Sequence, residues 1–192
     1  KGRLQKTTAL YDRLIAKGAR MDQSFGLEHA LWFADDQKDA WEDPSFERNR
    51  SHEYVSREVK AVREDVGGIE IANFAKHEFK GPGARKYLDR VLAGFVPKAG
   101  RLSLTPMLTP KGKLYGDLTV ACIEEDYFIL FGSGAMQEAH RRWFEKSLPE
   151  NVVYKNASDD WHGIAISGPK SRNLLKNIIR DDITAKVFEF RD

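Results

Sequence analysis

Short apolar runs separated by turn residues dominate the second half of the chain. Residues 102–122 predict a hairpin, in which a Pro110-Lys111-Gly112 turn joins two strands. The apolar run Tyr127–Phe131 predicts a core strand. Further strands are predicted at 152–154 and 164–166, and a strand pair or one long bent strand is predicted around Ile69, Ile71 and Phe79.

Five segments carry apolar residues at helical spacing. Thr7 or Thr8 is a suitable cap for a helix that runs to about Lys17 and stops at Gly18. The other helices are predicted over roughly 48–64, 82–94, 135–146 and 169–179. Strands joined by tight turns, together with these helices, predict the α+β class with a mostly antiparallel sheet and flanking helices.

Residues 19–47 are aromatic and acidic without a clear period. They include Trp32 and Trp41 among several carboxylates, a composition too aromatic for disorder. We therefore expect an irregular excursion packed on a neighbour. This divides the chain into residues 1–47, the N-terminal helix and aromatic excursion, and residues 48–192.

Composition limits the classes of partner. The net charge of +2 implies no general polyanion partner, and the basic run Lys1–Lys6 is expected to be a solvated lead-in. Because Cys122 is the single cysteine, an internal disulfide is excluded; its apolar surroundings, without an evident basic neighbour, predict a buried thiol. No apolar run approaches the ~20 residues of a membrane span. We expect a cytoplasmic protein, or one of the mitochondrial matrix if the source is eukaryotic, with no nucleic-acid or membrane partner.

Asp117 is the leading candidate for chemistry. It lies inside the second strand of the predicted hairpin, where Asp is depleted. An acid kept in such a position needs a partner in the protein or in a ligand. Asp117 therefore predicts a binding site, although a solvent-facing Asp without a role is an equally good interpretation at this point.

Ser133 and the histidines are further candidates for a site. Ser133 follows a predicted strand in a Gly-Ser-Gly turn, where its hydroxyl can contact a ligand or cap the next helix. The five histidines show no metal-binding spacing, so no metal site is expected. We place His77 on the polar face of its strand and His140 in helix packing.

The sequence also contains an internal echo. Gly81-Pro82-x-x-Arg85-x-x-Leu88 recurs 87 positions later, beginning at Gly168. Both copies follow an apolar strand and open a helix, so a repeated strand-to-helix building block, with the arginine on the surface, explains them better than a phosphate cradle does.

The order of several segments resembles the glycine cleavage T-protein family of folate-dependent aminomethyltransferases, most of all the folate-binding region of dimethylglycine and sarcosine dehydrogenases. The segments that carry this resemblance are Thr8–Arg13, Gly18–Met21, Val66–Ile71, Phe79–Pro82, Met107–Val120, Gly132–Phe144 and Ile166–Lys170. Under it, residues 48–192 are a T-protein-like folate-binding domain, incomplete at its C-terminus.

The resemblance implies a tetrahydrofolate site with Asp117 near the reactive folate nitrogen. Leu104, Tyr115 and Ser133 are implied as further pocket residues. Leu104 stands where T-proteins carry a tyrosine, and Ser133 where they carry an asparagine. A second family carboxylate lies beyond Asp192, and FAD is implied only in an upstream domain or subunit.

The function implied is tetrahydrofolate-dependent one-carbon transfer within an N-methyl amine dehydrogenase. The partners would be folate, a small N-methyl amine or aminomethyl donor, and a flavoprotein domain or subunit. Alternatives are a free-standing T-protein-like aminomethyltransferase or demethylase, and a non-catalytic module that docks on a flavoprotein. The polar start and strand-like end also lead us to expect a piece of a longer polypeptide.

Overall fold

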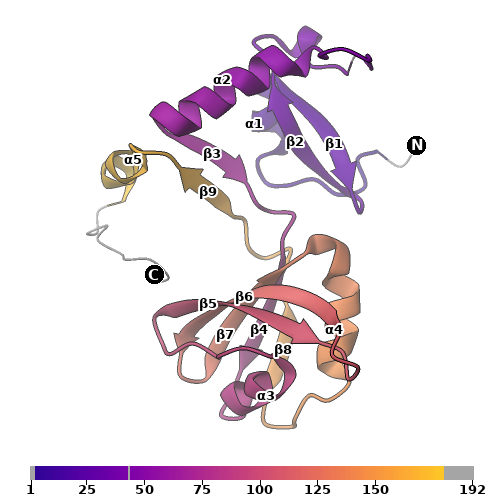
Figure 1. Cartoon of the computed structure of the whole chain (residues 1–192), viewed down its shortest axis with the longest axis vertical. Helices are drawn as coiled ribbons and strands as arrows, with labels where there is room; N and C mark the ends of the chain where they lie inside the picture. The colour runs from indigo at the N-terminus through magenta and orange to yellow at the C-terminus, as the bar shows by residue number, and fades with distance from the viewer. Residues whose placement is uncertain (1–2, 43, 180–192) are drawn as a thin grey trace. The chain divides into compact units, whose positions relative to one another are not determined.

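The computed structural model describes residues 3–42 and 44–179, which form two compact units (Figure 1). Unit 1 holds the described residues up to Asn73 and those from His162 onwards. Unit 2 holds Phe74–Trp161.

Within its described residues, unit 1 contains two small antiparallel sheets. β1 (Ala19–Ser24) pairs with β2 (Leu27–Phe33), and β3 (Gly67–Glu70) pairs with β9 (Ile164–Ser167). The helices are α1 (Tyr11–Ala16), η1 (Gln37–Asp39, a 3-10 turn), α2 (Ser51–Glu64) and α5 (Ser171–Ile178). Gly18 ends the first helical segment as predicted, with a left-handed φ of 84°.

The β1–β2 hairpin shows that the irregular structure expected from residue 19 is wrong over Ala19–Phe33. Ser24 pairs with Leu27, so Phe25 and Gly26 form a two-residue turn with φ values of 53° and 89°. Positive φ at both positions is the geometry of a type I′ turn, which suits the twist of a hairpin. Phe rarely adopts it, so the turn is hard to predict. A separate domain over residues 1–47 stays a prediction.

The described part of the basic lead-in is exposed, as expected, and it is also tied to this hairpin. The Arg3 guanidinium donates to both carboxylate oxygens of Glu28, whose side chain is fully buried, and the Leu4 N–H donates to Oε1 at 3.2 Å. The hydrogen bond from Arg3 lowers the pKa of Glu28 below its ordinary value. Arg3 thus remains exposed while it anchors the segment to the buried Glu28.

Unit 2 is built on a five-stranded antiparallel sheet. The strand order is β5 (Arg101–Leu108), β6 (Leu114–Glu124), β7 (Tyr127–Gly132), β4 (Ala75–Lys80) and β8 (Val153–Asn156) (Figure 1). Its helical elements are α3 (Ala84–Val91), η2 (Gly134–Met136, a 3-10 turn) and α4 (Gln137–Glu145). The α+β class, the 102–122 hairpin and the helices are confirmed.

One expectation about pairing is wrong. Ile69 and Phe79 belong to β3 and β4, which do not pair with each other. β3 pairs with β9 in unit 1, whereas β4 lies between β7 and β8 in unit 2. The pairing partners lie far away in the sequence, so local apolar spacing could not identify them.

The core of unit 2 lies on one face of its sheet, under α3 and α4. Alternation along β6 buries Leu118, Val120 and Cys122 on this face. They join Phe79, Leu88, Phe128, Leu130 and Phe144 in one cluster. Each fully buried Leu or Phe contributes about 1.5–3 kcal/mol relative to exposure. The opposite face of the same sheet carries the exposed side chains of Leu104 and Asp117 beside the buried Ala121 and Ile129.

Cys122 is buried as predicted, but it does have a basic neighbour. The Arg85 guanidinium donates to the Cys122 Sγ at 3.3 Å and to the Pro97 carbonyl oxygen at 3.0 Å, and it pairs with Glu125. Burial nevertheless raises the pKa of the Cys122 thiol, against the effect of Arg85. Arg85, the arginine of the first copy of the echo, therefore links α3 to β6 and does not stand free on the surface.

The two glycines that begin the echo have the same backbone geometry. Gly81 and Gly168 have φ values of 121° and 125°, and a Cβ on either would come within 2.4 Å of a backbone oxygen. The helices then begin at Ala84 and Ser171. These positions require glycine, as a repeated strand-to-helix turn predicts.

Candidate functional site

The site begins at Asp117 on β6. β6 is an interior strand of the sheet, and Asp117 lies opposite Pro106 of β5. Its side chain is exposed and makes no hydrogen bond or ion pair with any residue of the described ranges. The structure thus presents an unpartnered carboxylate on the sheet face opposite the core.

Leu104 shares this face with Asp117. Leu104 pairs with Thr119, two residues after Asp117, so Leu104 and Asp117 are diagonal neighbours. Leu104 is 62% exposed, an unusual state for a leucine in a strand. Thr119 also pairs with Phe131 of β7, which continues the same row across the sheet.

Ser133 lies beyond the paired part of the sheet. The last β6–β7 pair is Thr119 with Phe131, and β7 ends at Gly132, so the register does not place Ser133 against Asp117. Ser133 keeps an extended backbone, with φ −64° and ψ 127°. Its side chain makes no capping hydrogen bond to η2, so the capping role considered from the sequence is wrong.

Tyr115 does not join these residues. The β5–β6 register shifts between Met107 and Leu108, and this bulge turns Tyr115 towards α4. Its ring centroid lies 4.8 Å from that of Trp143 and 5.7 Å from that of His140. Of the four predicted residues, the register brings together Asp117 and Leu104.

Pairing adds a charged row that the sequence did not single out. Lys76 of β4 pairs with Phe131, and Glu78 pairs with Ile129, which places both on the Asp117 face. The Tyr127 hydroxyl donates to Glu78 Oε1 at 2.5 Å, and Lys80 Nζ lies 3.7 Å from the same oxygen. Burial, reinforced by Glu78, raises the pKa of Tyr127 to about 12. Strand alternation along β4 was the available signal.

Two histidines lie beneath the site, on the core face. His77 and His140 are 0% and 1% exposed, and their ring centroids lie 6.0 Å apart. The polar-face placement of His77 is wrong, since it shares the face of Phe79 two residues on. Burial, with a smaller contribution from His140, lowers the pKa of His77 to about 4. The packing role predicted for His140 is confirmed.

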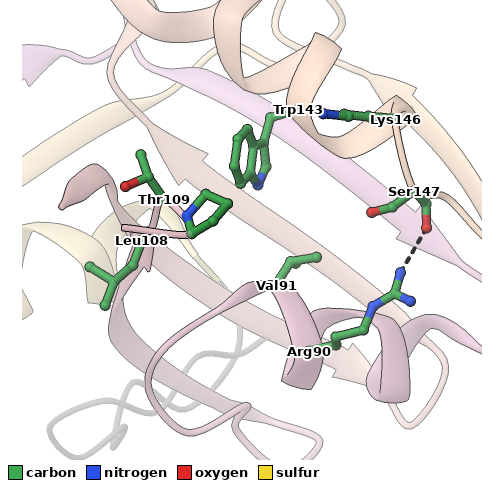
Figure 2. A pocket seen from close by; sticks show the side chains of 8 residues that line it. Arg90, Val91, Leu108, Thr109, Trp143, Lys146 and Ser147 are labelled. Atoms are coloured by element: carbon green, nitrogen blue, oxygen red, sulfur yellow. Dashed lines mark hydrogen bonds between the residues drawn. The ribbon is translucent and has the colours of Figure 1, made fainter. Parts of the chain in front are cut away.

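A surface pocket lies beside Tyr115 but apart from Asp117. Figure 2 shows this hollow of about 460 Å³, which the ends of α3 and α4 form with the β5–β6 turn. It is lined by Arg90, Val91, Leu108, Thr109, Pro110, Trp143, Lys146 and Ser147. The Arg90 guanidinium donates to the Ser147 carbonyl oxygen at 2.8 Å. None of the four predicted site residues lines the pocket.

The described residues contain neither a candidate metal site nor a helix that could span a membrane. No group of three or more His, Cys, Asp or Glu side chains is placed to hold a metal ion. No helix in the described ranges has the length and apolarity needed to cross a membrane.

Comparison with known proteins defines the family. The chain belongs to the GCVT N-terminal domain family, which matches residues 10–192. Mitochondrial dimethylglycine dehydrogenase of Homo sapiens is 33% identical over 190 residues, covering 97% of this chain and 22% of that protein. An aminomethyltransferase of Natranaerobius thermophilus is 28% identical over 138 residues, covering 70% of this chain and 38% of that protein.

Other similarities agree with this assignment. Sarcosine oxidase subunit alpha of Rhizobium meliloti is 31% identical over 173 residues, covering 85% of this chain and 17% of that protein. The glycine cleavage system aminomethyltransferase T of Bartonella henselae has the same fold, with a TM-score of 0.76 at 17% identity over 96% of this chain and 46% of that one. The resemblance read from the sequence is confirmed, and the chain spans less than half of each of these proteins.

Proposed function

We propose that this chain provides the folate-binding part of a one-carbon transfer enzyme of the dimethylglycine or sarcosine dehydrogenase kind. Asp117 is the catalytic carboxylate, near the reactive nitrogen of tetrahydrofolate. The observation that carries the proposal is the exposed, unpartnered carboxylate on an interior strand. Relatives named as dimethylglycine dehydrogenase and aminomethyltransferase support the class of reaction.

The surroundings of Asp117 fit a flat ring that carries an amine. Leu104 offers an exposed apolar surface, and Phe131 is half-buried in the same face. Ser133 adds a hydroxyl that is not used for capping. A mixed apolar and polar surface of this kind is typical of small-molecule sites. Tyr115 contributes through its packing on α4 rather than as a direct contact.

The proposed chemistry of Asp117 is electrostatic. Tetrahydrofolate, when bound, supplies the amine nitrogen that takes up the one-carbon unit. The Asp117 carboxylate accepts a hydrogen bond from an N–H group and so orients the amine. Its negative charge also stabilises positive charge that develops beside it during transfer. FAD and the oxidation of an N-methyl amine belong to a domain or subunit outside this chain.

The proposal is tested by Asp117→Ala in the full-length natural protein. We expect loss of one-carbon-loaded folate while oxidation of the amine donor continues. Glu124→Gln is the matched control, because Glu124 is an exposed carboxylate at the other end of β6. An unchanged yield of folate product in Asp117→Ala contradicts the proposal. Comparing glycine-derived, N-methyl amine and methyl-sulfonium donors separates the alternative transferases and demethylases.

A second candidate, docking on a flavoprotein, rests on exposed aromatic residues in unit 1. Phe25 is 81% exposed, and Phe46 is also exposed, whereas Trp32 is buried. Co-purification with a flavoprotein in the absence of folate binding would favour this candidate over the catalytic one. The location, in the cytoplasm or in the mitochondrial matrix, stays a prediction.

A further inference from the structure

We propose that His140 is a positioning residue for Asp117, holding the bulged start of β6 through the Tyr115 carbonyl group, with the His77 ring packed against it. This inference rests on the proposed function of Asp117. Its structural part can be tested without folate.

His140 of α4 contacts the backbone of β6. His140 Nε2 lies 3.0 Å from the carbonyl oxygen of Tyr115, two residues before Asp117. A carbonyl oxygen only accepts hydrogen bonds, so Nε2 of His140 carries the proton. The other ring nitrogen, Nδ1, is then an acceptor in the neutral ring.

The contact between His140 and Tyr115 lies at a bulge in β6. The β5–β6 register shifts at the start of β6, where Tyr115 has no partner on β5. A bulge leaves one residue out of the ladder, and therefore weakens the local hold on the strand. The bond from His140 reaches the backbone at this point. It replaces a ladder contact immediately before the segment that carries Asp117.

Glycine in the sheet leaves space for the imidazole ring of His140. A Cβ on Gly116 would lie 2.8 Å from His140 Nε2 and 3.0 Å from its Cε1. A Cβ on Gly132 would lie 3.6 Å from His140 Nδ1 and 2.5 Å from Leu118 Cδ2. Gly116 thus lets the ring approach the sheet, whereas at Gly132 the close contact is with Leu118 and the distance to the ring is an ordinary one. Gly116 directly precedes Asp117, so the ring is packed against the backbone that presents the carboxylate.

His77 is the second buried histidine, and its ring lies against that of His140. His77 Nδ1 lies 2.8 Å from the Tyr154 hydroxyl oxygen. If Tyr154 donates this bond, His77 carries its proton on Nε2, while His140 has a bare Nδ1. These are the two ring nitrogens that are buried without a hydrogen-bond partner among the described residues. The two nitrogens therefore make no hydrogen bond to each other, and His77 acts on His140 by packing, edge to face, with ring centroids 6.0 Å apart.

The test compares two His140 variants with different hydrogen-bonding capacity. Gln retains an N–H donor on a side chain of similar reach, whereas Met retains apolar volume without a donor. Nitrogen-15 NMR of the chain reports the tautomer of His140 and the environments of the Gly116 and Asp117 amides. We expect the Nε2–H tautomer in the parent chain, and Gly116 and Asp117 amides that shift and exchange faster in His140→Met but not in His140→Gln.

Binding provides the second arm. Loss of one hydrogen bond predicts that His140→Met weakens tetrahydrofolate binding about two- to tenfold, with recovery in His140→Gln. A protonated Nδ1, or equal effects of Met and Gln on the Asp117 amides, would overturn the positioning role. Failure of the parent chain to bind folate would count against the proposed function alone, because the amide measurements still decide the structural claim.

Discussion

Pro106 of β5 lies opposite Asp117 of β6 in the antiparallel register. The Pro106 carbonyl oxygen accepts a hydrogen bond from the Ala93 N–H at 2.8 Å, on the side of β5 away from β6. Pro106 and Asp117 therefore form a non-hydrogen-bonded pair, in which facing side chains approach most closely. Proline is tolerated here because β5 is an edge strand. Pro106 therefore forms the surface beside the Asp117 carboxylate and makes no hydrogen bond to its oxygens.

Asp117→Thr is expected to separate stability from function. The carboxylate has no partner among the described residues, and Thr suits an exposed strand position better than Asp does. Chemical denaturation is expected to show a gain of up to about 1 kcal/mol in the free energy of unfolding, while folate-dependent transfer is lost. A clear loss of stability would mean that Asp117 serves the fold.

Tyr127→Phe is expected to destabilise unit 2. The Tyr127 hydroxyl donates to the largely buried Glu78 carboxylate at 2.5 Å. Removing a bond to a charged acceptor costs about 1.5 kcal/mol or more. Urea denaturation measures this loss, with Tyr11→Phe as the control. Spectrophotometric titration is expected to lose a phenol that ionises near pH 12. Equal stabilities of the two variants would contradict the account of Glu78.

The stability of unit 2 is expected to fall in acid through His77. Its pKa is lowered from 6.5 to about 4 in the folded protein, mainly by burial. Above pH 6.5 neither state binds the proton. As pH falls from 6.5 to 4, the unfolded state binds it first, and the free energy of unfolding drops by up to about 3 kcal/mol. His77→Phe removes this component, so its stability should depend less on pH. Parallel curves for the parent and variant chains would contradict the assignment.

Phe25→Asn is expected to stabilise the β1–β2 hairpin. Phe25 adopts a φ of 53° and is 81% exposed, so its side chain contributes little packing. Asn accepts left-handed backbone more readily, and Asn-Gly is the preferred type I′ turn. The gain is expected to be about 0.5–1 kcal/mol in thermal or chemical unfolding, whereas Phe25→Val should destabilise. A loss of stability in Phe25→Asn would show that the exposed ring is used.

Local patterns predicted the elements of unit 2 better than their pairing. The 102–122 hairpin and the strand Tyr127–Phe131 follow from alternation and a short turn, because such contacts are local. The separation of Ile69 and Phe79 into two sheets depends on partners 96 and 49 residues away, respectively. The Phe25–Gly26 turn was missed because its first residue is atypical.

The candidate site was predictable in part. An acid inside a strand pointed to Asp117, and the register places Leu104 diagonally beside it, whereas Ser133 lies beyond the paired residues of β7. The bulge that turns Tyr115 towards α4 has no sequence signal other than Gly116. The buried pair of His77 and His140 joins β4 to α4 across 63 positions, so no local spacing could reveal it.

The most direct test is a calorimetric titration of tetrahydrofolate into the chain, repeated with Asp117→Asn and with Glu124→Gln. Asn has nearly the same shape as Asp but lacks the charge, and circular dichroism verifies that each variant is folded. The account predicts saturable binding in the parent chain and in Glu124→Gln, with binding lost or greatly weakened in Asp117→Asn. Equal affinity in all three would contradict the role of Asp117, and no binding in the folded parent chain would contradict a folate site formed by these residues alone.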